Sequence, residues 1–189
     1  MARKKYIRDY RLVETVDERG RIRSDYEYIG EDYFYALGTD AVRREKRTHL
    51  VLIAVGWLAF FGALLPSAAA TRTIYVALPF LFAAVPLCVM TDTLLSAAPD
   101  REPLQHRQAD MLENRYPPAA LWTAILPGAA LVGELVRLLI GAEATGSDAL
   151  FSLCAVILSA VGIMAFSRRR RFACRERQTT DTVNYSQSE

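Results

Sequence analysis

The residues with the greatest potential for chemistry are three charged side chains that interrupt long apolar segments. Glu134 and Arg137 lie three positions apart in one segment, and Asp92 lies near the end of another. A charge in an apolar segment is costly to desolvate, so these residues are the first candidates for a functional site. Glu134 and Arg137 would share one side of a helix and are expected to pair with each other. The alternative is a proton or substrate site inside the protein, whereas Asp92 is expected to cap its segment near water.

Sequence motifs for common catalytic and metal sites are absent. The chain has no phosphate-binding glycine loop, no His-Glu-x-x-His motif, no Cys-x-x-Cys pair and no nucleophile elbow. The two histidines belong to different segments, which disfavours a metal site. We expect His49 at a membrane interface and His106 beside Asp110, four residues later. We therefore expect no enzymatic activity, no metal and no cofactor.

The elements that carry these residues are four long apolar segments. Of the 189 residues, 52% are hydrophobic and 23% are charged, and the two classes occupy different parts of the chain. About 20 apolar residues in a helix cross the hydrocarbon core of a bilayer. Within a membrane domain of residues 38–167, we predict spans at about 48–65, 73–95, 117–140 and 148–167. The first span begins too late to be a cleavable signal peptide.

Basic residues predict the orientation of the spans, because Lys and Arg near short loops are retained in the cytoplasm. They cluster before the first span, in the loop 96–116 and at 168–171, whereas the other two loops contain only Arg72. We expect a multi-pass protein of the cell membrane with both termini cytoplasmic. The excess of Arg over Lys, with abundant Ala and Leu, suggests a bacterial inner membrane.

Residues 1–37 are predicted to form a cytoplasmic β-hairpin around the turn Asp17-Glu-Arg-Gly20. In its second strand Ile22, Tyr26 and Tyr28 alternate with charged residues, which gives a mostly apolar face. An isolated two-stranded hairpin is marginally stable. That face is therefore expected to dock on the central loop, the membrane interface, a second copy or another protein.

Tyr33 and Tyr35 follow the hairpin and have two interpretations. Their rings suit the headgroup level of a membrane, where aromatic residues form belts. They also suit a protein-docking surface, because a tyrosine ring packs while its hydroxyl group stays hydrated. In the second interpretation they extend the surface formed by Ile22, Tyr26 and Tyr28.

The central loop is predicted to contain a short amphipathic helix with Pro103 in its first turn. Leu104, Met111 and Leu112 would share one side of it and meet the apolar face of the hairpin. The tail, residues 168–189, is expected to be basic and then disordered beyond Arg177. Its arginines are expected to fix the topology rather than to bind nucleic acid.

Prolines and small residues predict the shape of the helix bundle. Pro79, Pro86 and Pro127 should bend or loosen the helices that contain them. Small residues four positions apart allow helices to approach closely. Such pairs are Ala59 and Ala63, Ala124 and Gly128, Ala129 and Gly133, and Ala155 and Ser159.

The sequence therefore predicts an all-α membrane protein: a four-transmembrane-helix bundle with a small N-terminal cytoplasmic β-hairpin and a short amphipathic helix in the central cytoplasmic loop. The favoured function is a non-catalytic accessory or scaffold subunit whose hairpin docks a partner or a second copy. The alternative is a small oligomeric transporter or channel that uses Glu134 and Arg137. The expected partners are the lipid bilayer and a protein or second copy, without nucleic acid.

Overall fold

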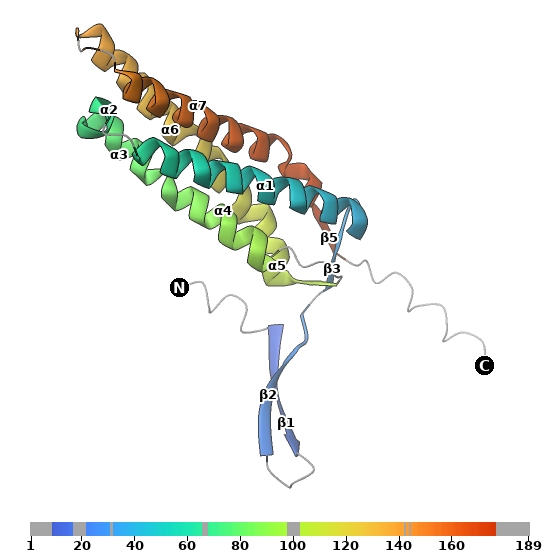
Figure 1. The fold of residues 1–189 in the computed structure, drawn as a ribbon. Helices are drawn as coiled ribbons and strands as arrows, with labels where there is room; N and C mark the ends of the chain where they lie inside the picture. The colour runs from blue at the N-terminus through green and yellow to red at the C-terminus, as the bar shows by residue number, and fades with distance from the viewer. Residues whose placement is uncertain are drawn as a thin grey trace, which may run out of the picture.

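The computed structural model describes residues 9–16, 22–30, 32–65, 68–97, 103–141, 143 and 145–176. Long helices lie side by side in a bundle, and short β-strands gather at one end (Figure 1). We call this the strand end, and the opposite end, where the connection between the last two helices lies, the loop end. Four helical stretches are long and apolar enough to cross a membrane: Asp40–Leu64, Ile74–Ala97, His106–Leu139 and Gly146–Ser167. The prediction of four apolar helices and an N-terminal hairpin is confirmed.

The first two apolar stretches differ in regularity. The first is the single helix α1 (Thr39–Leu64), whereas the second is divided at Ala83 into α3 (Ile74–Phe82) and α4 (Ala84–Ala97). Pro86 explains the division, because proline lacks an N–H and its ring clashes with the carbonyl group four residues earlier, at the end of α3. The sequence predicted this kind of distortion.

The third stretch begins before the predicted span. It consists of α5 (His106–Asp110), the π-helical turn η3 (Met111–Arg115) and α6 (Tyr116–Leu139). The first residue of α6 donates its N–H to the carbonyl group five residues earlier, which gives the wide turn of a π-helix. The predicted amphipathic helix is thus continuous with the third span. The placement of Pro103 in its first turn was wrong, because Pro103 precedes the helix.

The fourth stretch is α7 (Gly146–Ser167), whose backbone approaches that of α6 at Gly162. A Cβ atom at position 162 would lie 2.8 Å from the Ala124 Cα atom, so a larger residue requires the backbone to move. Nearby, the Ser159 hydroxyl group donates to the Ala124 carbonyl group at 3.1 Å. Two predicted pairs of small residues contribute Ala124, Gly128 and Ser159 to this close approach.

Replacing Gly162 with alanine should destabilise the protein, because the added methyl group meets backbone atoms rather than a flexible side chain. Overpacking of this kind costs about 1–3 kcal/mol. The measurement is the midpoint of thermal unfolding in mild detergent. Gly128→Ala is the matched control, since a Cβ atom there would meet only the Ser159 hydroxyl oxygen, at 3.8 Å. Equal midpoints for the two variants would contradict the close approach at Gly162.

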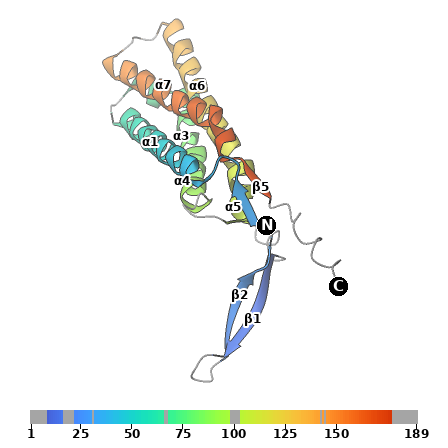
Figure 2. The same cartoon turned by 90° about the vertical axis from the view of Figure 1, so that its right-hand side faces the viewer.

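The predicted hairpin is formed by β1 (Tyr10–Val16) and β2 (Ile22–Tyr28), which pair in antiparallel register. Leu12 lies opposite Tyr26, so the two residues share one face of the hairpin. The hairpin extends away from the helices, and only its base lies near them (Figure 2).

A second, three-stranded sheet was not predicted. Its central strand is β3 (Asp32–Tyr35), which pairs with β4 (Leu104–Gln105) on one side and with β5 (Cys174–Glu176) on the other. The sheet therefore joins the N-terminal segment, the central loop and the start of the tail. The part of the tail predicted to be disordered, beyond Arg177, lies outside the described residues.

The hydrophobic core at the strand end corrects the predicted role of Leu104, Met111 and Leu112. These residues do not form a stripe against the hairpin, because β4 pairs with β3 and directs Leu104 into the bundle. They belong to a buried cluster of Tyr35, Val42, Ile53, Met90, Leu94, Ala97, Leu104, Met111, Leu112, Tyr116, Ala119, Ala120, Ala165 and Phe172.

Candidate functional site

The most concentrated charge in the described residues is a buried cluster at the loop end, where Arg137 bridges two carboxylates. Arg137 Nε donates to Glu134 Oε2 at 2.8 Å, and Arg137 Nη2 donates to Glu134 Oε1 at 2.6 Å. The same Nη2 lies 2.9 Å from Asp148 Oδ2. All three residues are buried: Glu134 is 2% exposed, Arg137 is 8% exposed and Asp148 is 3% exposed. The expected pair within α6 is present, and α7 adds a third charge.

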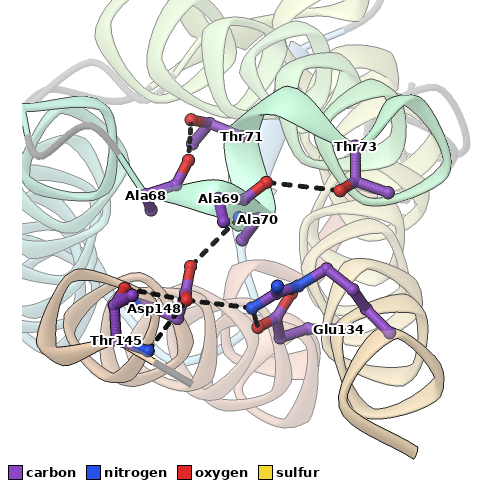
Figure 3. Close-up of polar contacts among 9 residues, drawn as sticks. Ala68, Ala69, Ala70, Thr71, Thr73, Glu134, Thr145 and Asp148 are labelled. Atoms are coloured by element: carbon purple, nitrogen blue, oxygen red, sulfur yellow. Dashed lines mark hydrogen bonds and ion pairs between the residues drawn. The ribbon is translucent and has the colours of Figure 1, made fainter. Parts of the chain in front are cut away.

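Asp148 also connects the two loops of the loop end (Figure 3). Its Oδ1 atom accepts from the N–H of Ala70 at 3.0 Å, in the short helix α2 (Ala69–Arg72). Its Oδ2 atom accepts from the N–H and hydroxyl groups of Thr145, at 3.1 and 2.8 Å. Thr145 in turn caps the start of α7. One carboxylate thus joins α2, α6 and the N-terminus of α7.

The sequence analysis missed Asp148, although a local signal for it exists. Thr145 and Asp148 have the spacing of a capping box, which marks the start of a helix before an apolar run. The link from Asp148 to Arg137 and Ala70 has no such signal, because it depends on how α7 packs against α6 and α2.

The cluster is a structural clamp, because its hydrogen bonds and ion pairs join α2, α6 and α7. Each of its four carboxylate oxygens accepts from a donor of the chain, and Arg137 supplies one positive charge to the two carboxylates. Removing one partner of a buried ion pair leaves an uncompensated charge, which is strongly destabilising. The arrangement therefore holds the two loops of the loop end together.

Arg137→Met should destabilise the protein by about 3–5 kcal/mol, because it leaves two buried carboxylates without their cation. The measurement is again the midpoint of thermal unfolding in detergent. Arg72→Met is the control, since Arg72 lies in α2 at the same end but is exposed. If Arg137→Met unfolded at the temperature of this control, the clamp would not contribute to stability.

A second polar group lies at the strand end around His49, which is buried rather than placed at an interface as expected. His49 Nδ1 is hydrogen-bonded to the Tyr116 hydroxyl group. The Phe172 ring packs edge-on at 4.9 Å and covers the imidazole. Among the described residues His49 Nε2 has no hydrogen-bond partner. The sequence did not reveal this burial, because Phe172 reaches His49 from the far end of the chain.

The arginine run after α7 fastens the tail to α1. Glu45 lies one turn before His49 and is only 7% exposed. It accepts from Arg168 at 3.4 Å and forms an ion pair with Arg171. Further along the tail, the Cys174 N–H in β5 donates to Glu113 Oε1 in η3 at 3.0 Å. Arg168 and Arg171 therefore hold the start of the tail against α1, which the sequence analysis did not predict.

The base of the hairpin is fixed to the central loop. The Tyr10 hydroxyl group donates to Gln105 Oε1 at 2.9 Å, and the His106 N–H donates to the Tyr28 hydroxyl group at 2.9 Å. Burial raises the pKa of the Tyr28 phenol, which therefore stays neutral. His106 Nδ1 lies 3.5 Å from Asp9 Oδ2.

The expected partner of His106 was Asp110, and both residues have contacts with other side chains. Asp110 Oδ1 accepts from Asn114 Nδ2 at 2.8 Å, one helical turn further along. His106 also reaches Asp9 beside the hairpin, because β4 brings the start of α5 to the base of β1.

The five predicted docking residues have different environments. The side chain of Tyr26 is 71% exposed, and that of its cross-strand neighbour Leu12 is 52% exposed. Tyr28 is used at the base of the hairpin, and Tyr35 is buried in the core at the strand end. Tyr33 packs against that core and has its ring 5.6 Å from that of His106. The side chain of Ile22 lies outside the described residues, although its backbone pairs with Val16.

Asp92 is exposed on the outer side of α4, near the strand end. Its Oδ1 atom accepts from the Ser96 hydroxyl group at 3.2 Å. It does not join the buried cluster of Glu134 and Arg137, which lies at the opposite end of the bundle. In the described part of the chain, no group of three or more His, Cys, Asp or Glu residues has the arrangement of a metal site.

Comparison with known proteins gives no relative. No protein-family model matches the chain, and no curated protein or solved structure is significantly similar to it. A functional proposal therefore rests on the geometry above.

Proposed function

We propose that the protein crosses a membrane four times, with the strand end and both termini in the cytoplasm of a bacterial cell. The outward surfaces of its helices support this proposal, since soluble proteins rarely expose large apolar patches. Exposed apolar side chains on these surfaces include Val51, Leu58, Phe61, Ile74, Leu81, Val85, Trp122, Val132, Leu139, Leu153, Val156 and Ile163.

The distribution of basic residues supports the orientation. The exposed arginines at the strand end include Arg43, Arg44, Arg47, Arg107, Arg115, Arg170 and Arg175. At the loop end, Arg72 is the one exposed Lys or Arg among the described residues. Basic residues beside membrane spans are retained on the cytoplasmic side.

The orientation can be tested with a native thiol. Cys174 lies in β5 at the strand end and is partly exposed. A membrane-impermeant maleimide should label it in inside-out vesicles but not in intact cells. The variant Glu143→Cys/Cys174→Ser, which moves the thiol to an exposed position of the loop end, should show the reverse. Labelling of Cys174 in intact cells would contradict the proposed orientation.

Within this topology, the protein is best explained as a non-catalytic accessory or scaffold subunit whose hairpin docks a partner protein or a second copy. The observation that carries this proposal is the exposed cross-strand pair of Leu12 and Tyr26. Exposed aromatic and apolar residues placed side by side are typical of the central contacts of protein interfaces.

The geometry of the hairpin suits this role. Its base is held by Gln105 and His106, so its orientation is fixed by the bundle. Its strands continue for six residues, or about 20 Å, beyond Tyr10 and Tyr28 at that base. Leu12 and Tyr26 lie two residues, about 7 Å, from Tyr10 and Tyr28 at the base, on a hairpin that extends away from the helices (Figure 2).

The transporter alternative depends on Glu134 and Arg137. Both are already engaged in the clamp with Asp148, and transport through them would require these bonds to break in each cycle. The accessory proposal needs no such rearrangement. Substrate flux into vesicles that Glu134→Gln abolishes would favour the alternative.

A photo-crosslinking amino acid tests the docking surface. Placed at Tyr26 in cells, it should give one discrete adduct, whose mass identifies a foreign partner or a second copy. Placed at Glu27, which faces the other side of the hairpin and is also exposed, it should give little of that adduct.

Leu12→Ser should lower the yield of the adduct from position 26 severalfold, because it removes half of the apolar pair. Arg11→Ser, on the opposite face, is the matched control. Equal yields from positions 26 and 27, or no discrete adduct at either position, would contradict docking through this face.

A further inference from the structure

The outward face of α1 combines an apolar stripe with arginines at its strand end. Val51, Val55 and Leu58 are exposed and lie four and then three residues apart, so they follow one side of the helix. Arg47 is exposed one turn before Val51, and Arg43 is exposed one turn before Arg47. The charges thus continue the stripe at its strand end.

The surfaces of α6 and α7 repeat this arrangement. Arg115, the last residue of η3, is exposed two turns before the exposed Trp122 of α6 and three turns before Ile125. After α7, Arg170 is exposed two turns beyond the exposed Ile163. Three outward apolar stripes therefore end in an exposed arginine at the same end of the bundle.

We propose that these arginines bind the phosphate groups of anionic phospholipids in the cytoplasmic leaflet, with Arg43 and Arg47 forming the main site. This inference rests on the membrane placement proposed above. It extends that placement, because it specifies the lipid class that the protein prefers. It is independent of docking through the hairpin.

The chemistry and dimensions of the site fit a phospholipid. The guanidinium group is planar and presents paired N–H donors to phosphate oxygens. Arg47 precedes Val51 by four residues, or about 6 Å along the helix. A lipid whose acyl chains lie on Val51, Val55 and Leu58 would therefore have its phosphate at the level of Arg47.

Two acidic residues, Asp40 and Glu45, lie close to this site in the sequence. Arg43 lies 3.9 Å from Asp40, whose side chain is fully exposed. Glu45 compensates Arg168 and Arg171 rather than the outward arginines. Anionic lipids bring a negative charge to these exposed arginines, whereas zwitterionic lipids carry no net charge.

The test uses the intact protein with an equimolar mixture of phosphatidylglycerol and phosphatidylcholine. Native mass spectrometry gives the ratio of the two lipids bound. Arg43→Gln/Arg47→Gln should lower this ratio by about 25-fold, because each arginine near an anionic surface contributes about fivefold in affinity. Arg72→Gln, at the loop end, is the matched control and should keep the ratio of the unmodified protein.

The charge-preserving variant Arg43→Lys/Arg47→Lys guards against an effect on folding and should restore most of the preference. An unmodified protein without lipid preference, or a glutamine variant that keeps it, would overturn the inference. Flotation with vesicles of phosphatidylcholine alone tests membrane placement separately. If the protein floats but shows no preference for phosphatidylglycerol, only the proposed lipid site is contradicted. If the protein does not float, the membrane proposal itself is contradicted.

Discussion

The close approach of α7 to α6 determines much of the structure. Because Gly162 lets the two backbones meet at Ala124, α7 lies along α6 over its length. At the loop end this alignment brings Asp148 to Arg137. At the strand end it delivers the chain after α7 to α1, where Arg168 reaches Glu45 and Phe172 covers His49. One steric contact in the middle of the bundle thus places polar interactions at both of its ends.

The two ends of the bundle are fixed by different means. At the loop end, buried charges hold the connections, and each carboxylate oxygen of the cluster accepts a hydrogen bond. At the strand end, β3 pairs with strands from the central loop and the tail, and Phe172 seals the core beneath them. Both arrangements join segments that are far apart in the sequence. The helices are therefore held together at both ends, and the hairpin extends from the strand end.

The tyrosines near the N-terminus divide according to their distance from the strand end. Tyr35 is part of the core, and Tyr28 uses its hydroxyl group to hold the central loop. Tyr26 lies two residues before Tyr28 in β2 and is exposed. Position along the hairpin, rather than residue type, therefore separates the buried or partly buried tyrosines from the exposed one.

The sequence by itself determined the features that depend on neighbouring residues. Four apolar helices follow from the length of the apolar segments, the hairpin from alternation around Asp17-Glu-Arg-Gly20, and the pairing of Glu134 with Arg137 from their spacing. Tertiary structure alone decided that Asp148 completes the buried cluster and that Tyr33 pairs with both Leu104 and Glu176. The physical reason is that local periodicity specifies which face of an element is apolar. It does not specify which distant segment will cover that face.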